Sequence, residues 1–117
     1  MAAAAPLGPY SPVVRAGDWV ITSGQLGIKD GSLVEGGIRA ETKQVVANIA
    51  TRLAEHGAEL TDVVKTLCIV RTLDEFAEFN EAYVEAFGGH RPARSTFAGG
   101  LLLGASVEIE AWAYKPA

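Results

Sequence analysis

The segment 91–96, Arg-Pro-Ala-Arg-Ser-Thr, places an arginine beside a proline and two hydroxyl residues. Pro92 fixes its own φ and pushes the preceding residue toward extended backbone, whereas Thr96 and Phe97 favour a strand. Arg94 is therefore predicted to lie where a loop becomes a strand. A guanidinium in that place can bind a carboxylate or a phosphate through two parallel hydrogen bonds. The alternative is a surface arginine near a strand end.

A second group of candidate residues alternates along the segment 107–114, which reads as the last strand. One face carries Glu108, Glu110, Trp112 and Tyr114, and the other carries Val107, Ile109, Ala111 and Ala113. On a solvent face the two large aromatic side chains would have no packing role, and in a core both carboxylates would need partners. A face buried between subunits, with a polar cleft at its edge, meets both demands. The pattern therefore predicts a homo-oligomer.

The composition suits one domain covering residues 1–117. Hydrophobic residues make up 49% of the chain, which is enough for a core. The net charge is -4 and the lysines and arginines are scattered, so a phosphate footprint for nucleic acid is not expected.

Other classes of site receive no support from the sequence. His56 and His90 stand far apart, and no cluster has metal-ligand spacing, so no metal is expected. Cys68 is the only cysteine and is predicted to be a small buried hydrophobe, which excludes an intrachain disulfide and agrees with a reducing compartment. No run reaches transmembrane length, and residues 1–6 look like a loose terminus rather than a targeting segment. The expectation is a cytoplasmic protein that does not contact membranes.

These candidate residues need a scaffold, which hydrophobic periodicity predicts. The expected elements are strands at 13–15 and 19–25, a helix at 38–56, a strand at 63–71, a helix from 73 to about 88, and a strand at 107–114, with a further short strand around 96–103. The order β-β-α-β-α-β predicts an α+β two-layer sandwich, in which a mixed sheet carries both helices on one face. The other face is left for a partner.

The two helices differ in how clearly their faces separate. In the first, a stripe through Val45, Ile49 and Leu53 faces the core, and Glu41 and Arg52 are expected to face water. In the second, the apolar stripe consists of Phe76, Phe79, Tyr83 and Phe87, and Asn80 falls on that same side. A buried amide needs partners, so Asn80 is either a core amide bonded to nearby backbone or a support for the loop that carries Arg94.

Three further residues lie in the N-terminal part of the chain. Tyr10 stands between two prolines and either packs to pin the terminus or forms the wall of a site. Ser23 and Gly24 lie near the end of the second predicted strand, and Gly24 allows another group to approach the backbone closely. The glycine-rich loop 26–37 matches neither common phosphate-binding pattern.

At this point the chain resembles the YjgF/RidA family of reactive enamine/imine deaminases. Five segments carry the resemblance in the right order, from about Pro6 to Tyr114. They are Gly-Pro-Tyr-Ser at 8–11, Ile-Thr-Ser-Gly-Gln at 21–25, Phe-Asn-Glu-Ala-Tyr at 79–83, Pro-Ala-Arg-Ser at 92–95 and Val-Glu-Ile-Glu-Ala at 107–111. Each segment alone is weak, and the five together are specific.

The resemblance implies a chorismate-mutase-like fold and a homotrimer with clefts between neighbouring subunits. It implies that Arg94 binds the substrate carboxylate and that Glu108 positions or activates a water, with no cofactor. The other residues that it expects to line or support the cleft are Tyr10, Ser23, Gly24, Asn80, Ser95 and Thr96. The implied substrates are 2-aminoacrylate and related enamines or imines of the 2-iminopropanoate type, which are hydrolysed to 2-keto acids and ammonia.

The chain departs from the family pattern at two places, and two functions other than deamination are also considered. Many deaminase members carry cysteine where this chain has Thr96, and the segment 102–106 is more apolar than the turn typical of the family, which could alter the substrates that fit. A non-catalytic trimer that binds small carboxylates is the alternative from another class. Ribonuclease or translation-inhibitor activity is the third, and the acidic balance of the chain argues against it.

Overall fold

A computed structural model describes residues 6–117; the expected loose terminus falls mostly on residues 1–5, outside the described part. The strands are β1 (Val13–Ala16), β2 (Trp19–Thr22), β3 (Gln25–Leu26), β4 (Ile28–Lys29), β5 (Ser32–Leu33), β6 (Val63–Val70), β7 (Ala93–Ala98) and β8 (Val107–Tyr114). The helices are α1 (Gly37–Ala54) and α2 (Phe76–Ala86), with short 3-10 turns at Leu60–Asp62, Leu73–Glu75 and Leu102–Gly104. Within 6–117, neither helix combines the length and apolar character needed to cross a membrane.

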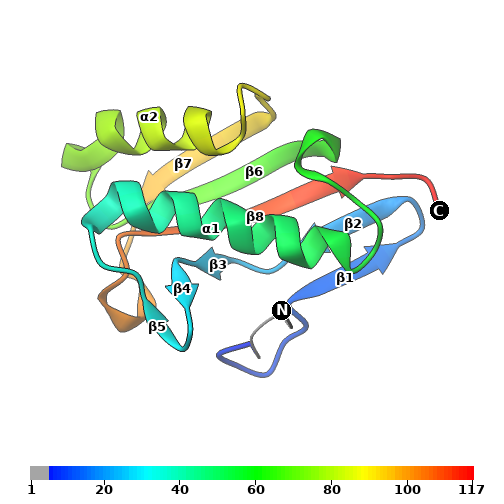
Figure 1. Ribbon diagram of the computed structural model, residues 1–117, viewed down its shortest axis with the longest axis horizontal. Helices are drawn as coiled ribbons and strands as arrows, with labels where there is room; N and C mark the ends of the chain where they lie inside the picture. Colours follow the sequence, from blue (N-terminus) through cyan, green and yellow to red (C-terminus); the bar gives the residue numbers. More distant parts are fainter. Residues whose placement is uncertain (1–5) are drawn as a thin grey trace.

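The main sheet has the strand order β1-β2-β8-β6-β7, and β3 also pairs with β8. Strands β6 and β7 are parallel, while the other pairs in this sheet are antiparallel. Figure 1 shows α1 and α2 lying side by side across the same face of this mixed sheet. The α+β two-layer arrangement predicted from the sequence is therefore confirmed.

Two strands differ from the predicted boundaries. Strand β7 spans Ala93–Ala98 instead of about 96–103, and Arg94 is its second residue, so it lies where the loop becomes a strand, as predicted. The expected strand 19–25 is divided, because Ile21 faces Trp112 in the ladder whereas Gln25 faces Ile109. This leaves one extra residue on the N-terminal side, which is the signature of a bulge. The bulge allows the chain to bend immediately before Gln25.

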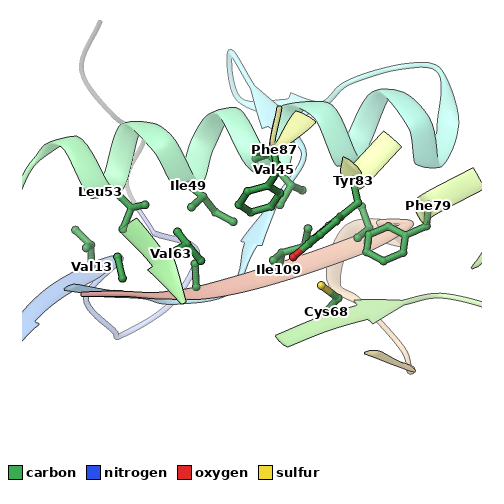
Figure 2. Packing of buried hydrophobic residues seen from close by; sticks show 14 of the residues in the cluster. Val13, Val45, Ile49, Leu53, Val63, Cys68, Phe79, Tyr83, Phe87 and Ile109 are labelled. Carbon is green, nitrogen blue, oxygen red and sulfur yellow. The ribbon is translucent and has the colours of Figure 1, made fainter. Parts of the chain in front are cut away.

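The core lies between the helices and the sheet face formed by alternate residues of β8. Val45, Ile49 and Leu53 of α1 are fully or almost fully buried, as the stripe predicted. Figure 2 shows these side chains pointing from α1 toward the sheet, with Val45 above Ile109 of β8 and Leu53 near Val13 and Val63, while the rings of Phe79 and Tyr83 from α2 and of Phe87 just after it pack beside Ile109. The Tyr83 hydroxyl and the Thr66 hydroxyl form a buried 2.7 Å hydrogen bond, so the polar end of the ring is satisfied.

Glu41 departs from the expectation that it faces water, because only 6% of the residue is exposed. Its carboxylate accepts a 2.8 Å hydrogen bond from the backbone N–H of Ser106 and a 2.7 Å bond from the Ser106 hydroxyl. These bonds tie α1 to the turn that precedes β8. They supply the partners that a buried charge requires. Arg52 was also expected to face water and is likewise buried.

The second face of the sheet is not covered by any helix of the described chain. It carries Trp19, which is 40% exposed, and Phe97, which is 49% exposed. Trp19 packs edge-on against Tyr114, with ring centroids 5.3 Å apart. Glu108, Glu110 and Trp112 of β8 are half-buried on this face, so the alternation predicted for the strand is present. We refer to this side of the sheet as the open face.

Replacing Glu41 by alanine should strongly destabilise the fold. The substitution leaves the buried Ser106 N–H and hydroxyl without their acceptor, a loss of about 2–4 kcal/mol in the free energy of unfolding. Urea unfolding at fixed protein concentration measures it. The control is Glu85→Ala, which removes an exposed carboxylate from α2. Equal stability of the two variants would contradict a structural role for the Glu41–Ser106 bonds.

Candidate active site

Glu108 and Gly24 approach each other more closely than any side chain at position 24 would allow. A Cβ built on Gly24 would lie 2.6 Å from the Glu108 Cδ and would also overlap a carboxylate oxygen. The missing side chain therefore leaves the space that the Glu108 carboxylate occupies. This agrees with the expectation that Gly24 permits close approach to the backbone.

A pocket of about 210 Å³ opens beside this carboxylate. Tyr10, Gly24 and Glu108 all line it, so the structure brings together three of the residues singled out from the sequence. Most of the remaining wall is apolar. The apolar side chains come from Pro6, Leu7, Pro12, Leu26, Ile28, Leu102 and Leu103. For Leu102 and Leu103, the only sign in the sequence was the apolar run 101–103 followed by Gly104.

Partial burial raises the pKa of the Glu108 carboxyl group, because desolvation disfavours its charged form. The pKa of Glu110 is also raised, first by desolvation and then by the negative charge of Glu108. A raised pKa makes a carboxylate a better proton acceptor than an ordinary exposed carboxylate. Glu108 has this property and also borders the pocket, whereas Glu110 does not line the pocket.

Ser23 has a structural contact that explains how the pocket wall is held. Its hydroxyl donates a 2.6 Å hydrogen bond to the Ser11 carbonyl, and its backbone N–H donates a 2.9 Å bond to the Pro12 carbonyl. These bonds fix the segment that carries Tyr10 against the end of β2. In the described chain Ser23 therefore supports the wall through Ser11 and Pro12, and it is not among the residues that line the pocket.

Arg94 lies on the helix-covered side of the sheet, in the edge strand β7. Its guanidinium carbon is 5.6 Å from the Phe76 ring centroid, 5.3 Å from that of Phe79 and 4.9 Å from that of Tyr83. Cation–π attraction to three rings orients the cation. The planar group is thus positioned by α2.

Arg94 and Glu108 of one chain are on opposite faces of the sheet. Arg94 stands opposite Thr66, which stands opposite Ala111, and these residues point toward the helices. Glu108 stands opposite Ile69 on the open face. The two strands are separated by β6, which places their axes roughly 10 Å apart. One chain therefore does not bring these two candidate side chains together.

The other candidates divide between the same two faces. Ser95 is on the open face, where its hydroxyl accepts a 2.9 Å hydrogen bond from the Lys65 ammonium group. Thr96 stands opposite Cys68 on the helix side. Asn80 is half-buried on α2, and its buried side-chain oxygen makes no hydrogen bond within the described part of the chain. Asn80 thus offers an acceptor on the helix that holds Arg94.

Cys68 has the character predicted for it. It is fully buried, and burial raises the pKa of its thiol to about 11. A thiol with that pKa is a poor nucleophile at neutral pH. Among residues 6–117, no three His, Cys, Asp or Glu side chains gather in a way that would hold a metal ion.

Comparison with known proteins assigns the fold and the five sequence segments to one family. The family model described as endoribonuclease L-PSP, which represents the YjgF/RidA proteins, matches residues 1–115. The chain belongs to the YjgF/RidA family. The resemblance seen in the sequence is thereby confirmed.

Individual YjgF/RidA relatives cover almost the whole chain. A RutC family protein of Pyrococcus abyssi is 41% identical over 113 residues, which is 94% of this chain and 89% of the relative. A protein of Mus musculus named 2-iminobutanoate/2-iminopropanoate deaminase is 38% identical over 116 residues, covering 97% and 86%. The crystal structure of E. coli TdcF with bound serine superposes with a TM-score of 0.90 at 28% identity, covering 97% of this chain and 93% of that one.

Replacing Glu110 by glutamine should stabilise the protein increasingly as pH rises. The raised pKa means that the folded state holds the proton more tightly than the unfolded state does. Wild-type stability is therefore favoured at low pH and is lost as pH rises through the unfolded and then the folded pKa of this group. The difference in Tm between variant and wild type should be near zero at pH 4 and grow toward pH 7. Glu85→Gln corrects for the change in net charge, and a difference that shrinks with pH would contradict the shift.

Proposed function

We propose that this protein hydrolyses 2-imino acids and their enamine tautomers to 2-keto acids and ammonia. The observation that carries the proposal is the Glu108 carboxylate, held against the bare backbone of Gly24 at the edge of a pocket, with its pKa raised by burial. Such a group can orient a water and move its protons. The relatives named as deaminases support the same chemistry.

The proposed site lies between two copies of the chain, within a homotrimer. Arg94 of one copy would bind the substrate carboxylate, and Glu108 of a neighbouring copy would act on the imine carbon. The opposite-face placement of these residues supports this, because no single chain supplies both. The uncovered apolar side chains of the open face also support it, since contact with a second copy would remove them from water.

The reaction needs little more than positioning, because an imine carbon is already electrophilic. Glu108 accepts a proton from water as the water oxygen bonds to the imine carbon, and it passes this proton to the imine nitrogen, which gives a carbinolamine. Glu108 then takes the hydroxyl proton and passes it to the nitrogen as the carbon–nitrogen bond breaks, so that ammonia leaves, the oxygen becomes the carbonyl of the 2-keto acid, and Glu108 is again a carboxylate. Every atom comes from the imino acid and one water. The Arg94 fork fixes the carboxylate so that water approaches the carbon at a productive angle.

The main alternative is a trimer that binds small carboxylates without turnover, and the serine-bound TdcF structure is the observation that favours it. In that case Arg94 would still bind a carboxylate while Glu108 would have no effect on any rate. The endoribonuclease description of the family model is a further alternative. The net charge of -4 gives it little support, because RNA phosphates require compensating cations.

Glu108→Gln should keep the assembly intact and slow hydrolysis about 10²–10⁴-fold, since the amide retains the shape but cannot accept a proton. Gly24→Ala should also lower the rate, because the new Cβ displaces the carboxylate. The matched control is Gly100→Ala, where a Cβ would meet nothing within 4 Å and φ is not in the left-handed region. Ammonia release from an imine generated in situ by an amino-acid oxidase is the measurement. Wild-type rates in Glu108→Gln would remove Glu108 from the chemistry, whereas no ammonia release above background by the wild type would leave binding without catalysis as the better function.

Arg94→Lys keeps the positive charge but loses the planar guanidinium that can form two parallel hydrogen bonds to a carboxylate, so kcat/KM should fall on the order of 10²-fold.

Subunit mixing then tests whether the site is shared between two copies of the chain. Arg94→Ala and Glu108→Gln should each be inactive alone, yet after dissociation and joint reassembly they should recover up to about one quarter of wild-type activity, because random assembly restores some clefts. If both residues acted from one chain, mixing would restore nothing.

A further inference from the structure

The pocket beside Glu108 has an apolar entrance formed by two adjacent leucines. Leu102 is 64% exposed and Leu103 is 63% exposed, and both line the pocket that Glu108 borders. We call this pair the leucine lip. Exposed leucines are ordinary when they stand alone. Two in succession at the mouth of a pocket, with a catalytic candidate on its wall, require a different account.

We propose that the leucine lip and the pocket behind it receive the side chain of the substrate, and that this protein prefers 2-imino acids with large apolar side chains, of the kind derived from leucine, methionine or phenylalanine. The inference rests on the proposed function, and it goes further by naming the substrate class. A substrate whose imine carbon lies at Glu108 would have this pocket directly beside it, because Glu108 lines the pocket wall. Its side chain would enter a space of about 210 Å³.

Several polar side chains in the pocket wall already have partners within the chain. The Asn48 amide donates to the Leu26 and Ile28 carbonyls at 3.0 and 2.9 Å, and the Gln25 amide donates to the Ser23 carbonyl at 3.2 Å. The Arg52 guanidinium pairs with Glu55 at 3.2 Å. A charged or strongly polar substrate side chain would therefore lose its hydration and find few donors or acceptors in exchange. An apolar substrate side chain gains by entering this pocket, because its burial removes apolar surface from water.

The lip is fixed in place rather than free to withdraw. The Ala105 N–H donates to the Leu102 carbonyl at 3.0 Å, and Ala105 and Ser106 are buried. Ser106 is bonded to the Glu41 carboxylate, which anchors the turn to α1. Leu103 itself has φ of 60°, in the left-handed region that a residue with a side chain seldom adopts. The buried Ala105 and Ser106 that follow anchor the turn and keep the leucine at the entrance.

The expected selectivity follows from the apolar surface that the larger substrate buries. One methylene in a hydrophobic pocket changes kcat/KM about 10-fold or more. Wild-type protein should therefore hydrolyse the leucine-derived imine with a kcat/KM at least about 10-fold above that for the alanine-derived imine. Leu102→Ala and Leu103→Lys should each reduce this ratio toward one. Leu103→Lys places a cation at the entrance while keeping a side chain without β-branching at the same φ.

The experiment compares both imines, generated by an amino-acid oxidase in the presence of semicarbazide as a competing trap. Leu73→Ala is the matched control, because Leu73 is 59% exposed in another 3-10 turn and does not line the pocket. It should keep the wild-type ratio. A wild-type ratio near one, or a ratio unchanged in both lip variants, would overturn the proposed preference even if hydrolysis is rapid.

A binding measurement separates this inference from the proposed function. Calorimetric titration with pyruvate and with 4-methyl-2-oxopentanoate compares a small and a large apolar 2-keto acid without any turnover. Tighter binding of the larger acid, lost in Leu103→Lys, supports the side-chain pocket. If that result came with no hydrolysis of either imine, the deaminase proposal would fail while the pocket assignment stood. Equal affinity for both acids in the wild type would overturn the pocket assignment.

Discussion

Strand β8 lies at the centre of the sheet, and its two-residue alternation separates the interior of the protein from its chemistry. One set of its side chains, including Ile109, packs under α1 and α2, while Glu108 and Glu110 point to the other face. Shifting the strand by one residue would bury both carboxylates and expose the core. The antiparallel pairing with β6 on one side and β2 on the other keeps that register.

Buried polar contacts then convert this register into a shaped site. The Glu41 carboxylate holds the turn before β8 through Ser106, and Ser23 holds the segment that carries Tyr10. Both contacts join parts of the chain that are distant in sequence. The pocket therefore has walls from the N-terminal segment, the turn before β8 and α1, although no single element contains it.

The sequence was sufficient for the two helices, the fold class and the alternation of β8, because each depends on local periodicity, but it gave no sign of the short β4–β5 pair within the predicted loop 26–37. The sequence was insufficient for the surroundings of Arg94 and Glu41, which depend on contacts between distant parts of the chain. Arg94 was expected at the start of a strand and does lie there, but only the parallel pairing of β7 with β6 decides that it stands opposite Thr66 and under the rings of α2. Glu41 was expected to face water, because helical spacing cannot reveal that the Ser106 turn folds back onto that surface.

For the candidate site too, the sequence predicted the features that depend on local pattern and missed those that depend on long-range pairing. Tyr10, Gly24 and Glu108 belong to segments that the sequence could recognise, and the structure brings them to one pocket. The leucine lip was visible only as an unusually apolar turn, since exposure depends on where the turn is anchored. The separation of Arg94 from Glu108 was not visible at all, because a sequence pattern gives the face of a residue within its own strand and not its relation to another strand.

The position of Cys68 has a practical consequence for following how this molecule opens. It is the only cysteine in the chain, it lies in the central part of β6, and its thiol is fully buried with a pKa raised to about 11. Thiol reagents require an accessible thiolate, so labelling must wait until the sheet separates from the helices. The native sequence thus contains a single chemical reporter of core exposure, and labelling times would report the opening of the layer that supports the proposed site.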